Sequence, residues 1–314
     1  MTAKLASISP PKQPNRRTET PVRAFSETLQ SEKFIVTTEL TPPKGTDLAR
    51  LFERAEMLRD TVDAFNLTDS HAALMSMSPQ AVAHLLIDRG IEPILGITCR
   101  DRNRMALQSD LLATHALGIR NIVCMTGDHP DVGDHPDAMP VFDLDSIGLL
   151  KAVASHRKGE DLSGARLKDG SDFLAGAVVN PTAVDKDREM RRMEEKVAAG
   201  ARFFQTQAVF DPGAFESFMS VAGGFNVPII AGLIMLKSGD MARRLNAGLP
   251  GISVPERLID EMDRAQDLDG VSAEIAARTI KDIKPLCRGV HLMSVGREYQ
   301  IPRVLRASGI LDGY

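Results

Sequence analysis

The sequence predicts a single-domain (βα)8 TIM barrel, an α/β fold in which eight parallel strands alternate with helices. Three observations support this fold class. The 314 residues suit one barrel, which commonly uses about 250 residues, together with a tail. Short β-branched or apolar runs alternate with amphipathic stretches, which is typical of βαβ units. The first run is followed by Leu-Thr-Pro-Pro-Lys-Gly and not by the glycine-rich phosphate loop of a doubly wound sheet.

The elements follow in order along the chain. Between the first two runs, apolar residues recur at helical spacing after Asp47, and similar segments follow most of the other runs. The expected strands are residues 34–39, 64–68, 93–98, 121–125, 173–179, 203–209, 228–234 and 289–295.

Two regions fall outside this alternation. Residues 1–27 carry four prolines among charged residues and show no periodicity, so we expect a flexible or loosely docked arm before a barrel domain of residues 28–314. The longest insertion lies between the fourth and fifth strands, from Asp128 to about Gly170. Long loops in compact domains are often functional.

Composition excludes several classes of protein. The three cysteines are isolated and the seven histidines show no ligand spacing, so we expect no disulfides and no metal site, in a reducing cytoplasm. A net charge of −4 with interleaved signs gives no reason to bind nucleic acid. The longest apolar run is too short to span a membrane, so we expect a soluble protein.

In such a barrel the active site is built at the carboxyl ends of the strands and in the loops that follow them. Six polar residues occupy these places: Glu39, Thr68, Asp128, Asn180, Gln207 and Arg297.

Glu39 ends an otherwise apolar strand, where burial would raise the pKa of its carboxyl group and let it donate a proton near neutral pH. The alternative is a rim carboxylate paired with a basic residue. Asp128 follows Gly127, which would let the backbone approach a flat ligand. A turn or helix-capping aspartate is the alternative there.

Gln205 and Gln207 share one face of their strand, toward the barrel interior or its mouth. Because buried amides need partners, a structural network is the alternative to a binding role. Lys196 lies on a helix expected at 186–199, whose apolar face carries Met190, Met193 and Val197, and a lysine on a helix is ordinarily just solvated.

Several short motifs occur in one order along the chain: Thr38-Glu-Leu-Thr-Pro-Pro-Lys, Thr126-Gly-Asp, Ala199-Gly-Ala, Gln205-Thr-Gln and Gly296-Arg. This set, in this order and spacing from about residue 34 to residue 311, resembles the methylenetetrahydrofolate reductase family. No single motif is specific, but the ordered set is.

The resemblance implies FAD at the barrel mouth and hydride transfer that converts 5,10-methylenetetrahydrofolate to 5-methyltetrahydrofolate. It implies that Glu39 is the catalytic acid that protonates the folate, and that Asp128 lies close to both flavin and pterin. It assigns Gln207 and Arg297 to the folate. The residues implied to contact FAD are Thr68, Thr126, Gly127, Asp128, Asn180, Glu189 and Lys196.

The chain also departs from the family pattern. Better-known bacterial members have Arg at Thr126 and His at Gly96 and Asn180. The loop after the seventh strand reads Leu236-Lys-Ser-Gly-Asp-Met and lacks the Phe that stacks on NADH in NADH-using members.

These departures leave open whether NADH or NADPH is the electron donor. One alternative is oxidation of 5-methyltetrahydrofolate with a redox partner protein or another carrier, and a second is a non-catalytic subunit of a redox or methyltransferase complex. The resemblance further implies a homo-oligomer.

Overall fold

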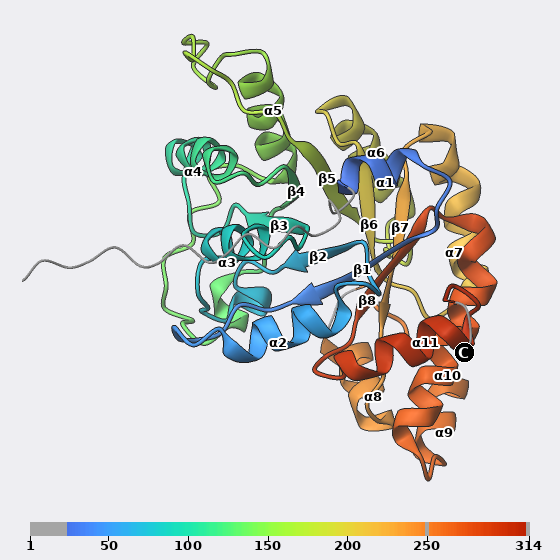
Figure 1. The fold of residues 1–314 in the computed structure, drawn as a ribbon. Helices are drawn as coiled ribbons and strands as arrows, with labels where there is room; N and C mark the ends of the chain where they lie inside the picture. Colours follow the sequence, from blue (N-terminus) through green and yellow to red (C-terminus); the bar gives the residue numbers. More distant parts are fainter. Residues whose placement is uncertain (1–23, 249–250, 312–314) are drawn as a thin grey trace, which may run out of the picture.

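The computed structural model describes residues 24–248 and 251–311, and eight parallel strands form a closed barrel in sequence order (Figure 1). Strand β1 pairs with both β2 and β8, which closes the barrel. The predicted fold class is therefore confirmed. The strands are β1 Ile35–Leu40, β2 Ala64–Leu67, β3 Pro93–Thr98, β4 Asn121–Met125, β5 Leu174–Val179, β6 Phe203–Ala208, β7 Ile229–Ile234 and β8 Gly289–Met293.

The strand ends lie close to those that the sequence predicts. The largest difference is at β8, which was expected to reach Val295 but ends at Met293. Val295 and Gly296 have φ angles of 52° and 82°, which are incompatible with a strand. A turn in the left-handed region therefore ends β8.

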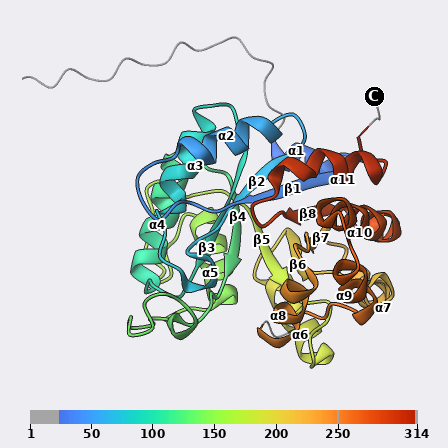
Figure 2. The ribbon, with the colours of Figure 1, turned by 90° about the horizontal axis from the view of Figure 1, so that it is seen from below.

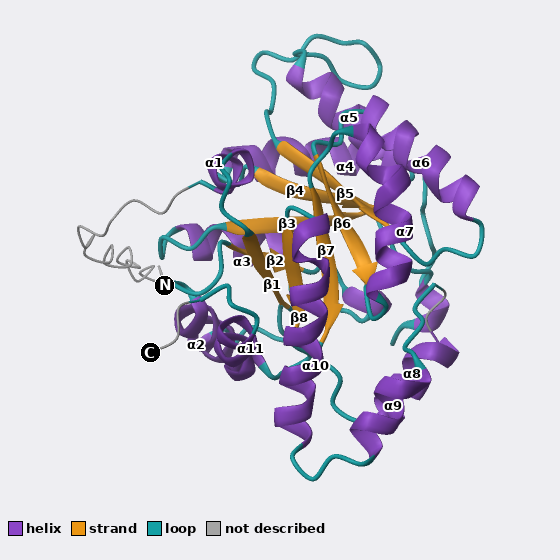
Figure 3. Cartoon of the chain, turned by 90° about the vertical axis from the view of Figure 1, so that its right-hand side faces the viewer, coloured by secondary structure: helices purple, strands orange, loops and turns teal. Residues whose placement is uncertain are grey.

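Helices cover the outside of the barrel (Figures 2 and 3). None of the helices in the described ranges is long and apolar enough to cross a membrane. The helices are α1 Phe25–Gln30, α2 Ala49–Leu58, α3 Pro79–Ile87, α4 Arg104–Ala116, α5 Ser146–Arg157, α6 Lys186–Ala198, α7 Pro212–Ala222, α8 Gly239–Gly248, α9 Glu256–Asp263, α10 Leu268–Ile283 and α11 Ile301–Ala307.

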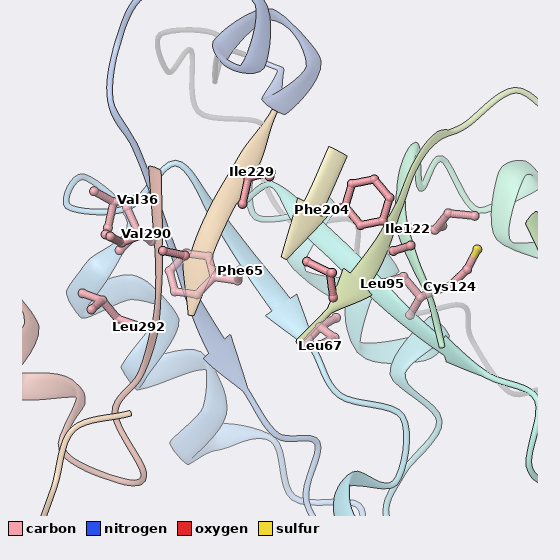
Figure 4. Close-up of a cluster of buried hydrophobic side chains, with 14 of the residues drawn as sticks. Val36, Phe65, Leu67, Leu95, Ile122, Cys124, Phe204, Ile229, Val290 and Leu292 are labelled. Carbon is pink, nitrogen blue, oxygen red and sulfur yellow. The ribbon is translucent and has the colours of Figure 1, made fainter. Parts of the chain in front are cut away.

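The main core lies between the outer face of the strands and these helices (Figure 4). Outward side chains such as Val36, Leu67 and Leu292 are almost completely buried there. On α2, Leu51 and Leu58 share the buried face, as the helical spacing predicts. Each fully buried side chain of this size contributes about 1.5–3 kcal/mol.

Helix α1 closes the barrel at the amino-terminal ends of the strands. Phe25 is completely buried and meets Phe203 of β6 edge-on, with ring centroids 5.6 Å apart. The cluster includes Ile35, Ile94 and other inward residues. The expected arm boundary at residue 28 thus falls inside α1, and residues 1–23 lie outside the described residues.

Polar side chains form the next layer of the interior. Asn66 and Gln205 exchange two amide hydrogen bonds of 2.7 and 3.1 Å across the barrel. Thr37 and His291 approach within 2.9 Å, and burial lowers the pKa of His291 to about 4, so its ring is neutral. The interior position expected for Gln205 is confirmed, with the structural partner that a buried amide needs.

The long insertion between β4 and β5 is two segments separated by helix α5. Residues 126–145 follow β4, at the end of the barrel where the strands terminate. Residues 158–173 lie at the opposite end, where Glu160 and Arg166 form an isolated antiparallel bridge. Only the first segment is placed to line an active site.

Candidate active site at the barrel mouth

All eight strands end on one side of the barrel because every strand pair is parallel. We call this side the mouth. The six strand-end residues expected from the sequence lie at or just beyond these ends: Glu39, Thr68, Asp128, Asn180, Gln207 and Arg297.

Glu39 projects toward the interior from the same face of β1 as Thr37, and it lies nearer the mouth than Thr37 does. Burial raises the pKa of the Glu39 carboxyl group, an effect that the nearby His71 and a 3.4 Å hydrogen bond from Thr41 Oγ1 partly oppose. The charge of Glu298 raises this pKa further. A carboxyl group in this environment can hold a proton near neutral pH.

Glu298 was not predicted from the sequence. It is 6% exposed and forms an ion pair with Arg54 of α2, with 3.3 Å between Nη1 and Oε1. The adjacent Gly296-Arg motif predicted a role for Arg297 but none for Glu298. The ion pair between Glu298 and Arg54 joins positions that are 244 residues apart. Sequence spacing cannot reveal such a contact.

Thr68 follows β2, and its Oγ1 atom is buried without a hydrogen-bond partner among the described residues. Its neighbour Asp69 accepts 2.9 Å hydrogen bonds from the backbone N–H and the hydroxyl of Thr98 and pairs with Arg102. The backbone after β2 is therefore fixed beside an unsatisfied hydroxyl. An unsatisfied buried group of this kind suits a ligand contact.

The segment Thr126-Gly127-Asp128 follows β4. Gly127 has a φ of +95°, and a Cβ atom there would lie 3.0 Å from Thr98 Cβ. Thr126 Oγ1 accepts a 3.2 Å hydrogen bond from Ser146 N at the start of α5. Asp128 is exposed. The glycine thus lets the chain pass close to β3 while the carboxylate reaches solvent at the mouth.

Asn180 and Glu189 lie together beyond β5. The Asn180 N–H donates to Glu189 Oε1 at 2.9 Å, and Asn180 Oδ1 accepts from the Thr182 N–H at 3.1 Å. Both residues line a small, solvent-open cleft of about 60 Å³ between α6 and α7, which Phe218 also borders. This cleft could receive part of an extended ligand.

Lys196 is 5% exposed, unlike the solvated lysine that is usual on a helix. Its Nζ donates a 2.7 Å hydrogen bond to the carbonyl oxygen of Val178. Burial lowers the pKa of Lys196, and Glu189 opposes this effect. A buried cation beside strand β5 is suited to an anionic group such as a phosphate.

Gln207 lies where the pairing between β6 and β7 shifts register, between Gln205 and Ala208. Thr206 maintains this irregularity by donating to the Gln207 carbonyl at 2.7 Å and accepting from Gly232 N at 2.9 Å. Such irregularities redirect side chains near active sites. Gln207 is half-buried at the mouth and Gln205 is buried.

Arg297 follows β8, and its Nη1 and Nη2 donate to the carbonyl groups of Leu236 and Lys237 at 3.4 and 3.5 Å. Its Nη1 forms a 3.1 Å ion pair with Asp269 Oδ1, and Asp269 also accepts a 2.6 Å hydrogen bond from the Tyr299 hydroxyl. The guanidinium group remains partly exposed. It can therefore offer further N–H donors to a carboxylate.

A family model described as methylenetetrahydrofolate reductase matches residues 24–309. Methylenetetrahydrofolate reductase 2 of Schizosaccharomyces pombe is 25% identical over 245 residues, 70% of this chain but 36% of the yeast protein. A probable methylenetetrahydrofolate reductase (NADPH) of Caenorhabditis elegans is 24% identical over 292 residues, 87% of this chain and 42% of the nematode protein. The chain thus matches less than half the length of these two relatives.

The chain matches a larger share of the length of its bacterial relatives. The 5,10-methylenetetrahydrofolate reductase of Salmonella typhimurium is 29% identical over 231 residues, which are 71% of this chain and 72% of that protein. Among solved structures, oxaloacetate acetylhydrolase aligns with a TM-score of 0.53 at 10% identity, over 94% of this chain and 89% of that chain. At this identity the structural likeness concerns the barrel alone.

Proposed function

Because the chain belongs to the methylenetetrahydrofolate reductase family, we propose that it is a flavin-dependent oxidoreductase that interconverts 5,10-methylenetetrahydrofolate and 5-methyltetrahydrofolate. The observation that supports this most is the desolvated carboxyl group of Glu39 at the mouth, where its pKa is raised. Reduction of the folate needs a proton donor as well as a hydride, and Glu39 is suited to be that donor.

In this proposal Glu39 protonates the folate, so that its bridging ring opens to the reactive iminium. Burial raises the pKa of Glu39 and so favours its protonated form, and the negative charge of Glu298 acts in the same direction. Asp128 orients the folate beside the cofactor. Gln207 and Arg297 bind the substrate, the latter through its glutamate tail.

The described residues fit FAD, which supplies the hydride chemistry when bound. Thr68 offers an unsatisfied hydroxyl group, Gly127 a close backbone approach and Lys196 a buried cation. Thr126 and Asp128 would contact the flavin on the same side of the mouth. Beyond β5, Asn180 and Glu189 would contact the rest of the cofactor in their cleft.

A second candidate function concerns the electron donor. The loop from Leu236 to Met241 has no aromatic side chain that could stack on a nicotinamide dinucleotide. The protein would then oxidise 5-methyltetrahydrofolate, or reduce the methylene form, with electrons exchanged through a partner protein or another carrier. A role as a non-catalytic subunit is less consistent with the structure, because such a role does not require a desolvated acid at Glu39.

Anaerobic titration tests these functions. The purified protein, loaded with FAD, is mixed separately with NADH, NADPH and 5-methyltetrahydrofolate while the oxidised flavin absorbance is followed. We expect the folate to bleach the flavin. Bleaching by NADH or NADPH as well identifies a nucleotide-dependent reductase, whereas bleaching by the folate alone favours the second candidate. A protein that cannot retain FAD contradicts both.

A further inference from the structure

Three loops at the mouth converge on one carboxylate, that of Asp134 in the segment after β4. Its side chain forms an ion pair with Lys44 from the loop after β1. It also accepts 2.9 Å hydrogen bonds from the backbone N–H of Met75, in the loop after β2, and from His135 Nδ1. The hydrogen bond from Lys44, followed by that from Met75, holds the pKa of Asp134 far below its usual range. Asp134 therefore stays ionised throughout the neutral pH range.

The loop after β2 needs such external support because its backbone is strained. Ser70, Ala72 and Ala73 have φ angles of 48°, 52° and 55°. Left-handed conformations of residues other than glycine are strained and persist only when surrounding contacts impose them. The strain lies directly after Thr68 and Asp69 and includes the segment of His71, whose charge acts on Glu39.

Backbone contacts also connect the loops after β1, β2 and β4 to one another. The Met77 N–H donates to the Pro43 carbonyl at 2.9 Å, which connects the loops after β2 and β1. Gly133 packs so closely on the Ala73 carbonyl that no side chain would fit there. The ion pair of Asp134 with Lys44 thus belongs to a contact network that spans three loops.

We propose that Asp134 is a positioning residue that holds the loops after β1, β2 and β4 in one arrangement around Glu39 and Thr68. This inference rests on the proposed function for its kinetic consequence, but its structural consequence can be measured without any ligand. Asp134 acts through the loops: Lys44 lies five residues after Glu39, and Met75 lies seven residues after Thr68.

The structural test is amide hydrogen exchange on the flavin-free full chain. In Asp134→Ala, we expect faster exchange in peptides that cover residues 41–46 and 70–77, while peptides of α10 exchange as in the parent protein. Asp137→Ala is the matched control, since Asp137 is exposed on the same segment. Unchanged exchange in the two loops overturns the proposal, and so does uniformly faster exchange that includes α10.

The kinetic test separates positioning from stability. At saturating FAD, we expect kcat of Asp134→Ala to fall about tenfold because Glu39 is misaligned, and KM for the folate to change less than twofold. Asp134→Asn and Lys44→Met should each lose part of this rate, and the double variant should lose no more than the worse single variant. Faster loop exchange with an unchanged kcat overturns the positioning role. Lack of activity in the parent protein refutes the proposed function instead, and the exchange data then decide the role of Asp134.

Discussion

The raised pKa of Glu39 connects the structure most directly to the proposed chemistry. If Glu39 is the proton donor, Glu39→Gln should lower folate turnover by about 10²- to 10⁴-fold, because a general acid contributes that much. FAD binding should persist, since the amide has nearly the same shape. Stopped-flow measurement of flavin oxidation by methylenetetrahydrofolate checks this loss. Glu216→Gln, on the exposed face of α7, is the control, and a Glu39→Gln protein with normal turnover would refute the acid role.

The same residue predicts the pH dependence of the rate. If Glu39 is the proton donor, its active form is the protonated one, and burial raises its pKa in the folded protein. The rate of folate reduction should therefore be highest on the acid side and fall as pH rises through that raised pKa. Single-turnover rates between pH 6 and 9 measure it. A rate that does not change with pH in this range argues for another donor.

The backbone geometry at Gly127 predicts the effect of adding a side chain there. In Gly127→Ala, the new Cβ meets Thr98 Cβ at 3.0 Å in addition to the cost of a positive φ. We expect a loss of about 2–4 kcal/mol in unfolding free energy, together with weaker FAD binding. Gly118→Ala separates the two effects, because Gly118 has a φ of +86° but its Cβ would meet nothing closer than 4.0 Å. Equal losses in both variants would show that crowding is unimportant. Urea unfolding and flavin fluorescence measure the effects.

At the scale of elements, helix α1 is fixed at both ends. Glu92 Oε1 accepts a 3.1 Å hydrogen bond from Phe25 N, and the Arg288 guanidinium donates to the Thr28 and Leu29 carbonyl groups at 3.0 and 3.3 Å. Both contacts satisfy backbone groups that a helix end leaves unpaired. The six-residue helix is thus stabilised by its tertiary contacts.

Phe25→Ala should destabilise the fold by about 3–5 kcal/mol, because it removes a completely buried ring from the barrel floor. FAD affinity measured on the folded protein should stay unchanged, since the proposed FAD site lies at the mouth, which is the opposite end of the barrel. Met105 is 75% exposed, so Met105→Ala should change stability by no more than about 0.5 kcal/mol. Weaker FAD binding in Phe25→Ala would mean that the two ends of the barrel are coupled.

The sequence predicted the strands well and α1 not at all. A strand that is buried on both faces appears as a continuous apolar run, as Ile229–Ile234 does. Helix α1 is too short for helical periodicity, and its main apolar contact is with Phe203, far away in the sequence. The positions of Glu39 and Gln207 at the mouth could be predicted from the strand ends. Glu298 and Asp134 could not be predicted, because their partners lie far away in the sequence.

For the whole molecule, the neutral His291 predicts sensitivity to acid. Its folded-state pKa of about 4 lies below the ordinary value of 6.5, so between these pH values the unfolded chain binds more protons. Stability is therefore complete above about pH 6.5 and falls toward pH 4, by up to about 3 kcal/mol from this group. Urea unfolding at pH 7 and pH 5 should show a smaller difference for His291→Gln than for the parent protein. His129→Gln, on the surface, is the control, and an identical difference in all three proteins would exclude His291 as the cause.

The reciprocal amide pair inside the barrel has a consequence for how this chain and its relatives can diverge. Asn66 and Gln205 are both buried and satisfy each other's amide groups. Changing either one alone leaves a buried donor and a buried acceptor unpaired, which costs about 1–3 kcal/mol, whereas replacing both with apolar residues of matching volume avoids that cost. Positions 66 and 205, which are 139 residues apart, should therefore covary during evolution as a single unit.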